Sequence, residues 1–411
     1  MFVSVNHESK NCFGSLKILG SKSESNRLLI LKELYPEIEI NNISNSEDTK
    51  TLYKALKKSS KKIDVNHAGT AMRFLTAFFS SIPGREVILS GSNRMHERPI
   101  KILVDALNSL GAKIQYLNKD GFPPLKIYGQ ELKNNIVSLK ADVSSQYITA
   151  LMLIAPSLKN GLEINLKKGV VSRPYIAMTK DLLNYFGIKV FFSENKIEIS
   201  PKIFIKEKVK LVEPDWSSAS YYFSIASLSQ KAKISLKNFK SDSLQGDSVL
   251  TNIYKKLGVE TTFNESEMII RKIPEFIFPK SISLNLSDTP DIAQTIAVSC
   301  FGLGVNCKLS GLKTLKIKET DRLIALKNEL EKVGAKVDIT EDVIDVSPLN
   351  LIKKNVKINT YNDHRMAMAF APLGIKTRID IKDPLVVNKS YPKFWDHLNC
   401  IGFKIKRNTN F

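Results

Sequence analysis

The sequence predicts an α/β protein of two domains, built from six copies of one repeating unit. Two kinds of helical segment alternate along its 411 residues. One kind is amphipathic and ends at a glycine that alternating, strand-like residues follow; the other is almost uncharged and apolar on all sides. Both recur about every seventy residues, and 411 divided by six is about 68. A period this long favours units that pack around a centre, three in each domain, over a linear stack.

The amphipathic segments are expected to be surface helices. A glycine directly after each helix permits the left-handed residue that ends it. Five segments share this pattern, and their glycines, spaced by 76, 71, 76 and 68 residues, are Gly111, Gly187, Gly258, Gly334 and Gly402. Residues 51–65 are interpreted as a sixth, weaker copy without the glycine. Each unit is therefore expected to hold one surface helix, one buried helix and several strands.

The apolar segments are expected to be helices buried inside the domains. They occupy residues 25–34, 69–79, 144–155, 217–228, 290–301 and 363–375. Starts at Ser145, Ser217, Pro290 and Asp363 are spaced by 72, 73 and 73 residues, which repeats the period of the glycines. Small polar residues open most of these helices, and the unpaired N–H groups of a helix start favour anions. Six such starts, three from each half, would form an anion-binding cleft between the domains.

Composition narrows the class of protein. Apolar residues make up 43% and charged residues 25%, which excludes a disordered or fibrous chain. Four cysteines without a C-x-x-C pair, and five scattered histidines, argue against a zinc site or a disulfide framework and fit a cytoplasmic protein. No targeting segment is visible, and the longest uncharged runs, 143–158 and 292–307, are too short to span a membrane. The net charge of +20 indicates anionic partners.

The positions of the arginines indicate where along the chain an anionic ligand would bind. The chain has 50 Lys and only 11 Arg, so lysine supplies its general surface charge. Arginine is the residue whose planar fork pairs bidentately with phosphate or carboxylate. Seven arginines lie in or beside the apolar segments: Arg27, Arg73, Arg94, Arg98, Arg173, Arg322 and Arg365. Arg73 and Arg94 fit a structural role at helix ends equally well.

Ordered motifs along the whole chain resemble the EPSP synthase family of enolpyruvyl transferases. The most specific are GSKSESNR (20–27), KETDR (318–322) and NDHRMAM (362–368), with HAGTAMR, DVSSQY, PDIAQT and KSYP between or after them. The resemblance implies an inverse α/β barrel in each of two domains, every domain with three βαβαββ repeats. One domain would be 21–213, mainly on the shikimate 3-phosphate side. The other would combine 1–20 with 214–411, mainly on the phosphoenolpyruvate side.

The resemblance also implies an activity and a set of site residues. The enolpyruvyl group of phosphoenolpyruvate would pass to the 5-hydroxyl of shikimate 3-phosphate, in a monomer without metal or organic cofactor. The residues implied for shikimate 3-phosphate are Lys22, Ser23, Arg27, Ser144, Ser145, Gln146, Ser172, Tyr175, Asp291, Thr314 and Lys318. Those implied for phosphoenolpyruvate are Lys22, Gly69, Arg98, Gln146, Arg322, Arg365 and Lys389. At Gly69 the absence of a side chain would let the ligand approach the backbone.

The chemistry needs one group to take the hydroxyl proton and another to protonate the methylene carbon. The resemblance points to Asp291 beside the hydroxyl, Glu319 at the methylene and Lys22 as a further proton carrier, although Lys22 and Glu319 could exchange roles. Taken alone, Asp291 could serve only as a helix-dipole partner, and Glu319 only as the partner of a nearby lysine.

Among the departures of this chain from the family pattern, two concern the affinity for the substrates. His67 stands where the family usually has Asn, and Thr314 where many members have Asn.

Two other functions compete with this one. The nearest alternative is the related transferase that acts on UDP-N-acetylglucosamine, but residues 90–100 lack its mobile-loop cysteine. A nucleic-acid-binding protein is the alternative from another class, but the lysines are dispersed and no zinc finger or aromatic-rich strand is present. We therefore expect neither nucleic acid nor membrane as a partner.

Overall fold

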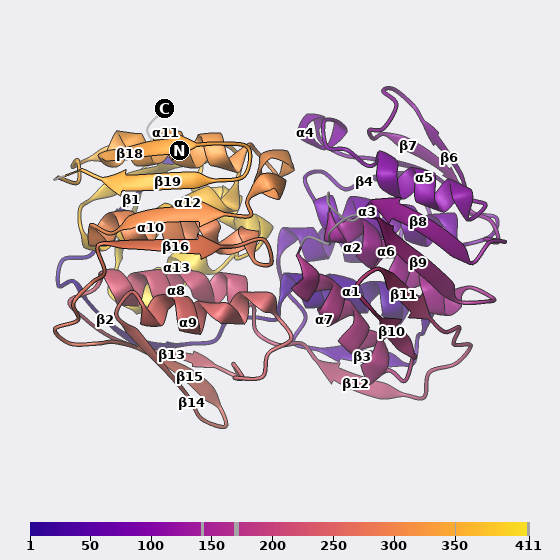
Figure 1. Ribbon diagram of the computed structural model, residues 1–411, viewed down its shortest axis with the longest axis horizontal. Helices are drawn as coiled ribbons and strands as arrows, with labels where there is room; N and C mark the ends of the chain where they lie inside the picture. Colours follow the sequence, from indigo (N-terminus) through magenta and orange to yellow (C-terminus); the bar gives the residue numbers. More distant parts are fainter. Residues whose placement is uncertain (141–143, 168–171, 350, 409–411) are drawn as a thin grey trace. The chain divides into compact units, whose positions relative to one another are not determined.

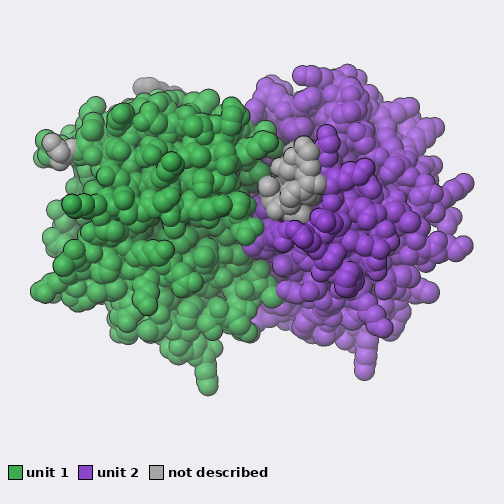
Figure 2. Space-filling model, in the orientation of Figure 1, with its two compact units in different colours: residues 1–19, 213–411 green, residues 20–212 purple. Residues whose placement is uncertain are grey.

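The chain folds into two compact units in the computed structural model, which describes residues 1–140, 144–167, 172–349 and 351–408. Unit 1 consists of residues 1–19 and 213–411, and unit 2 of residues 20–212 (Figure 2). The chain leaves unit 1 after strand β2 (Asn11–Leu16) and returns to it before helix α8 (Trp216–Leu228). Unit 2 is therefore inserted into unit 1, with boundaries one residue from those expected.

Three apolar helices pack against one another inside each unit (Figure 1). They are α1 (Lys22–Leu34), α3 (Gly69–Ser80) and α6 (Ser145–Ile154) in unit 2, and α8, α10 (Ala293–Leu303) and α12 (His364–Phe370) in unit 1. Almost every residue of α8 is buried, which explains why its sequence shows no polar face. The expected buried helices are thus confirmed.

Five of the six sheets in the described residues share one topology, a parallel strand pair extended by two antiparallel strands. In unit 2 they are β4 (Lys62–Asp64), β5 (Glu86–Ser90), β7 (Leu125–Tyr128) and β6 (Lys113–Tyr116), and β8 (Ile136–Lys140), β9 (Leu162–Lys167), β11 (Lys196–Ile199) and β10 (Val190–Phe192). In unit 1 the first two are β2, β13 (Lys231–Lys237), β15 (Glu267–Lys272) and β14 (Val259–Phe263), and β16 (Ser281–Asn285), β17 (Asn306–Ser310), β19 (Ile344–Pro348) and β18 (Ala335–Ile339).

The last sheet of unit 1 joins the two ends of the chain. It consists of β20 (Val356–Ile358), β21 (Ile379–Lys382), β1 (Phe2–Asn6) and β22 (Lys404–Asn408). Strand β1 lies between β21 and β22 and is antiparallel to both. The N-terminal strand thereby completes the repeat that the C-terminal residues begin.

One amphipathic helix accompanies each repeat. These helices are α2 (Glu47–Lys57), α5 (Lys101–Ser109), α7 (Arg173–Tyr185), α9 (Leu250–Lys255), α11 (Arg322–Val333) and α13 (Phe394–Cys400). The five glycines identified in the sequence all have φ between 75° and 110°. They therefore end their helices in the left-handed conformation that glycine adopts without steric cost.

The sixth repeat differs from the expected plan. Helix α2 is followed directly by β4, without a hairpin, and the repeat's sheet contains only β3 (Ile38–Asn41) and its parallel partner β12 (Lys208–Leu211). The expectation that every unit carries several strands of its own is therefore wrong for this copy. Residues 58–61 lack the glycine at which the other copies reverse direction, and the chain runs straight into the next repeat.

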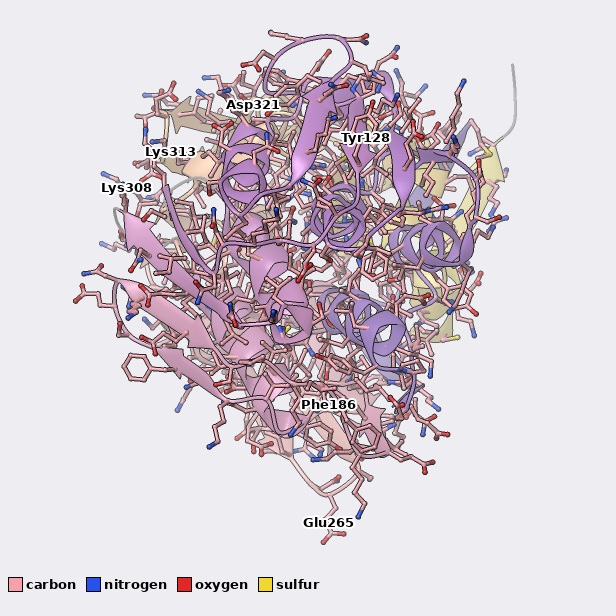
Figure 3. The ribbon with its side chains drawn as sticks, turned by 90° about the vertical axis from the view of Figure 1, so that its right-hand side faces the viewer. Tyr128, Phe186, Glu265, Lys308, Lys313 and Asp321 are labelled. Atoms are coloured by element: carbon pink, nitrogen blue, oxygen red, sulfur yellow. The ribbon has the colours of Figure 1, made fainter. Side chains whose placement is uncertain are left out.

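Buried and exposed residues alternate along the strands, as expected for sheets that cover a core on one face. In β17, Cys307 and Leu309 are buried, whereas Lys308 points away from the core (Figure 3). Glu265 lies at the tip of the β14–β15 hairpin, where Figure 3 shows it projecting from the sheet. In the described part of the chain, every helix is too short or too polar to cross a membrane.

Candidate active site

A buried arginine organises the polar residues of unit 1. Helix α11 begins at Arg322 because the Asp321 carboxylate accepts hydrogen bonds from the first backbone N–H groups of the helix, and Figure 3 labels this capping residue. The Arg322 side chain is 2% exposed. Its Nε donates to Asp363 (2.7 Å), its Nη1 to Asp291 (2.8 Å) and its Nη2 to Glu319 (2.9 Å). One guanidinium thus holds three carboxylates that come from three separate segments.

Three further cations complete this group, which we call the Arg322 cluster: Asp291, Lys318, Glu319, Arg322, Asp363, Arg365 and Lys389. Lys318 Nζ lies 3.4 Å from Asp291 Oδ1, and Lys389 Nζ lies 3.1 Å from Glu319 Oε1. Arg365 donates from Nη1 to the Asp291 carbonyl (2.9 Å), and its Nη2 lies 3.4 Å from Asp291 Oδ2. Six residues predicted as site residues therefore meet in one place.

The electrostatics of the cluster hold Asp291 ionised. Burial by itself would raise the pKa of Asp291, but Arg365, Lys318 and Arg322 hold this pKa well below its usual range. Burial would likewise lower the pKa of Arg322, but its three carboxylate partners raise it above the ordinary value. The sequence suggested cations that face an anionic ligand. The structure instead shows four cations paired with three carboxylates, so an anion must compete with these pairs.

Ser217 and Asp247 extend the cluster, although neither was predicted as a site residue from the sequence. Ser217 Oγ accepts a hydrogen bond from Arg365 Nη2 (3.3 Å) and donates one to Asp247 Oδ2. Asp247 is 5% exposed, its Oδ1 has no hydrogen-bond partner, and burial raises its pKa to about 6 despite the charge of Arg365. Nothing in the spacing of the two residues along the sequence revealed that they meet.

Exchange of Asp247 for asparagine is expected to stabilise the protein above neutral pH. The folded-state pKa of Asp247 lies above the ordinary value of 3.8. The contribution of Asp247 to the stability of the protein is therefore largest below about pH 4 and is lost as the pH rises through about 6. Asparagine still accepts the Ser217 hydrogen bond but cannot ionise. We expect a gain of roughly 2–3 kcal/mol at pH 8 and a smaller gain at pH 5, measured by urea denaturation. Equal gains at both pH values, or a gain from Asp242→Asn on the exposed part of the same loop, would contradict this origin.

A second group of predicted residues gathers at the helix starts of unit 2. Gln146 Nε2, in the first turn of α6, donates to Thr70 Oγ1 in the first turn of α3 (3.3 Å). The Ser144 hydroxyl caps α6 by accepting from the Gln146 N–H, so its own proton stays available to an acceptor. Ser172 precedes α7 with φ 55° and makes no capping hydrogen bond with its side chain. These helix starts present several short donors, as a phosphate site requires.

Lys22 and Arg27 lie five residues apart on α1 but differ in what they can offer a ligand. Lys22 opens the helix, and its Nζ lies 3.1 Å from Asp48 Oδ2. Arg27 is 4% exposed and donates to Thr179 (2.8 Å), the Ser23 carbonyl (2.7 Å), the Tyr175 carbonyl (3.1 Å) and Thr149 (3.4 Å). Four of its five N–H groups therefore bind the protein. Arg27 links α1 to α6 and α7, which leaves one N–H for a ligand.

The space that a side chain would fill at Gly69 is occupied by the Arg98 guanidinium. A Cβ atom at Gly69 would lie 2.5 Å from Arg98 Nη1 and 2.8 Å from Nη2. The absence of a side chain thus lets the guanidinium lie against the start of α3. Arg73 is buried and donates to the Gly69 and Pro99 carbonyls (3.2 and 3.0 Å), which supports the structural alternative for this residue.

Thr314 lies in a short 3-10 helix (Lys313–Ile317) that leads to Lys318, and its buried Oγ1 has no hydrogen-bond partner. Within the described residues, no three His, Cys, Asp or Glu side chains are placed to hold a metal ion.

Solved structures share the fold of the whole chain. EPSP synthase from Acinetobacter baumannii superimposes with a TM-score of 0.78 at 20% identity, over 99% of this chain and all of that one. The enolpyruvyl transferase NikO from Streptomyces tendae gives a TM-score of 0.75 at 12% identity, over all of this chain and 99% of that one. The chain therefore has the fold that this class of transferases shares.

Sequence comparisons narrow this class to one family. The family model for EPSP synthase (3-phosphoshikimate 1-carboxyvinyltransferase) matches residues 57–398. A 3-phosphoshikimate 1-carboxyvinyltransferase from Bacteroides fragilis is 44% identical over 397 residues, with 95% of this chain and 96% of the relative covered. One from Pasteurella multocida is 35% identical over 424 aligned positions, with 93% and 94% covered. The chain belongs to the EPSP synthase family and is an enzyme.

Proposed function

We propose that this enzyme transfers the enolpyruvyl group of phosphoenolpyruvate to the 5-hydroxyl of shikimate 3-phosphate, with release of phosphate, in aromatic amino acid biosynthesis. The relatives named for this reaction cover nearly the whole chain. The observation that carries the proposal is the Arg322 cluster, because it brings two carboxylates suited to proton transfer among four cations suited to a phosphorylated acid.

The donor, phosphoenolpyruvate, is assigned to Arg322, Arg365 and Lys389 in unit 1 and to Lys22, Gly69, Arg98 and Gln146 in unit 2. Its phosphate and carboxylate would take over hydrogen bonds that the cluster carboxylates now accept. Arg365 and Lys389 are each 9% exposed in their side chains, so their charges are little screened by water. Each of these cations would exchange a carboxylate of the cluster for an anionic group of the donor, and would therefore keep a charged partner.

The acceptor, shikimate 3-phosphate, is assigned mainly to unit 2. The hydroxyls of Ser144, Ser145 and Ser172 would bind its phosphate, together with Ser23, Gln146 and the remaining N–H of Arg27. Tyr175, whose ring centroid lies 5.8 Å from the Arg27 guanidinium, would face the sugar-like ring. Lys22, Asp291, Thr314 and Lys318 would bind the remaining oxygens.

The reaction adds and then eliminates. The 5-hydroxyl oxygen bonds to C2 of phosphoenolpyruvate, its proton leaves, and C3 gains a proton to give a tetrahedral intermediate. The C2–O bond to phosphate then breaks while C3 returns a proton. Glu319 is assigned to the C3 proton and Asp291 to the hydroxyl, with Lys22 as a further carrier that could exchange roles with Glu319. Because its pKa is low, Asp291 would orient the hydroxyl until the donor draws Arg322 and Arg365 away from it.

The proposed reaction is tested by phosphate release. The enzyme with phosphoenolpyruvate should release phosphate on addition of shikimate 3-phosphate, but not on addition of UDP-N-acetylglucosamine. EDTA should leave the rate of phosphate release unchanged, since no metal is assigned a role. In size-exclusion chromatography the enzyme should elute with the mass of a monomer. Absence of release with shikimate 3-phosphate would refute the proposal, as would release with the nucleotide sugar alone.

Exchange of Gly69 for alanine is expected to impair binding of the donor while the fold persists. The new Cβ must displace the Arg98 guanidinium, which is the far end of a flexible side chain. We expect KM for phosphoenolpyruvate to rise on the order of ten- to a hundredfold, with little change in KM for shikimate 3-phosphate. Gly84→Ala, where φ is 79° and the space around the Cβ is open, serves as the control for a substitution that strains the backbone without displacing a neighbour. An unchanged KM for phosphoenolpyruvate would show that Arg98 need not lie against Gly69.

A further inference from the structure

The turn before α12 places a bulky residue in a conformation that such residues seldom adopt. Thr360 accepts a hydrogen bond from the Asp363 N–H (2.8 Å), and the two central residues, Tyr361 and Asn362, have φ of 53° and 55°. Asparagine tolerates this left-handed region, whereas for tyrosine it costs free energy. Such strain persists only where surrounding contacts enforce it, and it is common at functional sites.

The enforcing contact is Glu329, a carboxylate with no exposed surface on α11. Its Oε1 accepts a hydrogen bond from the Tyr361 hydroxyl (2.6 Å), and its Oε2 accepts one from the Asn359 N–H (3.0 Å). Lys332, one turn further along α11, lies 2.6 Å from Oε1 and balances the charge. Burial and this hydrogen bond raise the pKa of Tyr361, so its hydroxyl remains a donor. Glu329 thus holds the turn on both sides of Thr360.

The same turn delivers Asp363 to the Arg322 cluster. Asp363 caps α12 by accepting from the Arg365 N–H (2.9 Å), and it accepts from Arg322 Nε and Nη2 (2.7 and 3.4 Å). Helix α11 therefore holds residues 359–363 at two points, through Glu329 and, two turns earlier, through Arg322. Arg322 and Arg365, the two arginines of the cluster that are assigned to phosphoenolpyruvate, therefore depend on where Asp363 lies.

We infer that Glu329 is a positioning residue, which clamps the strained Tyr361–Asn362 turn so that Asp363 orients Arg322 and Arg365 toward the donor's anionic groups. The inference rests on the proposed function for the identity of the donor. It assigns Glu329 no contact with substrate. Its effect passes through Tyr361 and Asp363 to the two guanidinium groups.

Two substitutions test the clamp. In Glu329→Gln the amide presents one oxygen and one NH2 to donors that now bind both carboxylate oxygens, so at least one hydrogen bond is lost. Tyr361→Phe is milder and removes only the hydroxyl. We expect each to raise KM for phosphoenolpyruvate on the order of tenfold, with kcat and KM for shikimate 3-phosphate changed less than threefold. The double variant should be no worse than the worse single variant, because both changes break one contact.

Glu331→Gln is the matched control, since this glutamate of α11 is exposed and pairs with Lys327 at 3.2 Å. It should leave both KM values unchanged. If the Glu329 and Tyr361 variants melt at a lower temperature but keep the wild-type KM for phosphoenolpyruvate, Glu329 stabilises the fold alone and the inference is wrong. Additive effects in the double variant would also overturn it.

A measurement without turnover separates this inference from the proposed function. Inorganic phosphate that binds the folded enzyme should raise its melting temperature in a concentration-dependent way. The rise should be smaller in Glu329→Gln and Tyr361→Phe than in Glu331→Gln. If wild-type enzyme releases no phosphate with shikimate 3-phosphate, the proposed function fails. If the phosphate-induced rise is equal in all variants, the clamp fails.

Discussion

Exchange of Glu319 for glutamine is expected to lower kcat by about a hundredfold or more, because the amide cannot carry the proton assigned to C3 of phosphoenolpyruvate. Glutamine keeps the size of the side chain and can still accept a hydrogen bond from Arg322 or Lys389, which now bind its two oxygens at 2.9 and 3.1 Å. Thermal stability should therefore change little. Steady-state kinetics with both substrates measure the effect.

Glu341→Gln is the control for Glu319, because this exposed glutamate of the same unit pairs with Lys316 at 2.7 Å. It should retain wild-type kcat. A Glu319→Gln enzyme with near-wild-type kcat would remove Glu319 from proton transfer and leave that role to Lys22.

Exchange of Arg322 for methionine is expected to destabilise unit 1 by about 3–5 kcal/mol and to abolish measurable activity. The substitution leaves Asp291, Glu319 and Asp363 without their shared cation, and Asp363 has no exposed surface. Protonation relieves uncompensated carboxylates, so the deficit in stability should shrink as the pH falls from 7.5 to 5. Urea denaturation at the two pH values measures it.

Two variants accompany Arg322→Met. Arg322→Lys restores one charge but not the three-way fork, and it should recover part of the stability and little of the activity. Arg407→Met, on the exposed part of β22, should change neither. A deficit that is the same at both pH values would mean that lost packing, rather than uncompensated charge, dominates.

The repeat architecture could be predicted because the helices and turns of each repeat depend on residue patterns within short segments. Apolar runs such as 217–228 became buried helices, and glycines such as Gly334 ended surface helices, since burial and the left-handed conformation constrain residue type directly. The exception was the copy at 51–65, where a helix pattern persists although no hairpin follows it. The missing glycine was the only local sign of that difference.

The site was predicted less evenly. Asp291, Lys318, Glu319, Arg322, Arg365 and Lys389 come together in unit 1, as their motifs suggested. Asp247, Ser217 and Glu329 were missed, because a residue that acts through another residue shows no pattern of its own in one sequence. The approach of a ligand to Gly69 stays a prediction, and the structure places the Arg98 guanidinium beside this glycine.

The sequence by itself determined the period, the helix types, the class of ligand and the motifs that place the chain in its family. These features depend on contacts within a few residues or on composition. Only the tertiary structure decided which charges neutralise one another, that Arg27 and Arg73 are largely occupied by the protein, and that Glu329 holds a strained turn 32 residues further along the chain. The physical reason is that the free energy of a buried charge depends on the partners that folding brings to it from distant segments, and no local pattern records them.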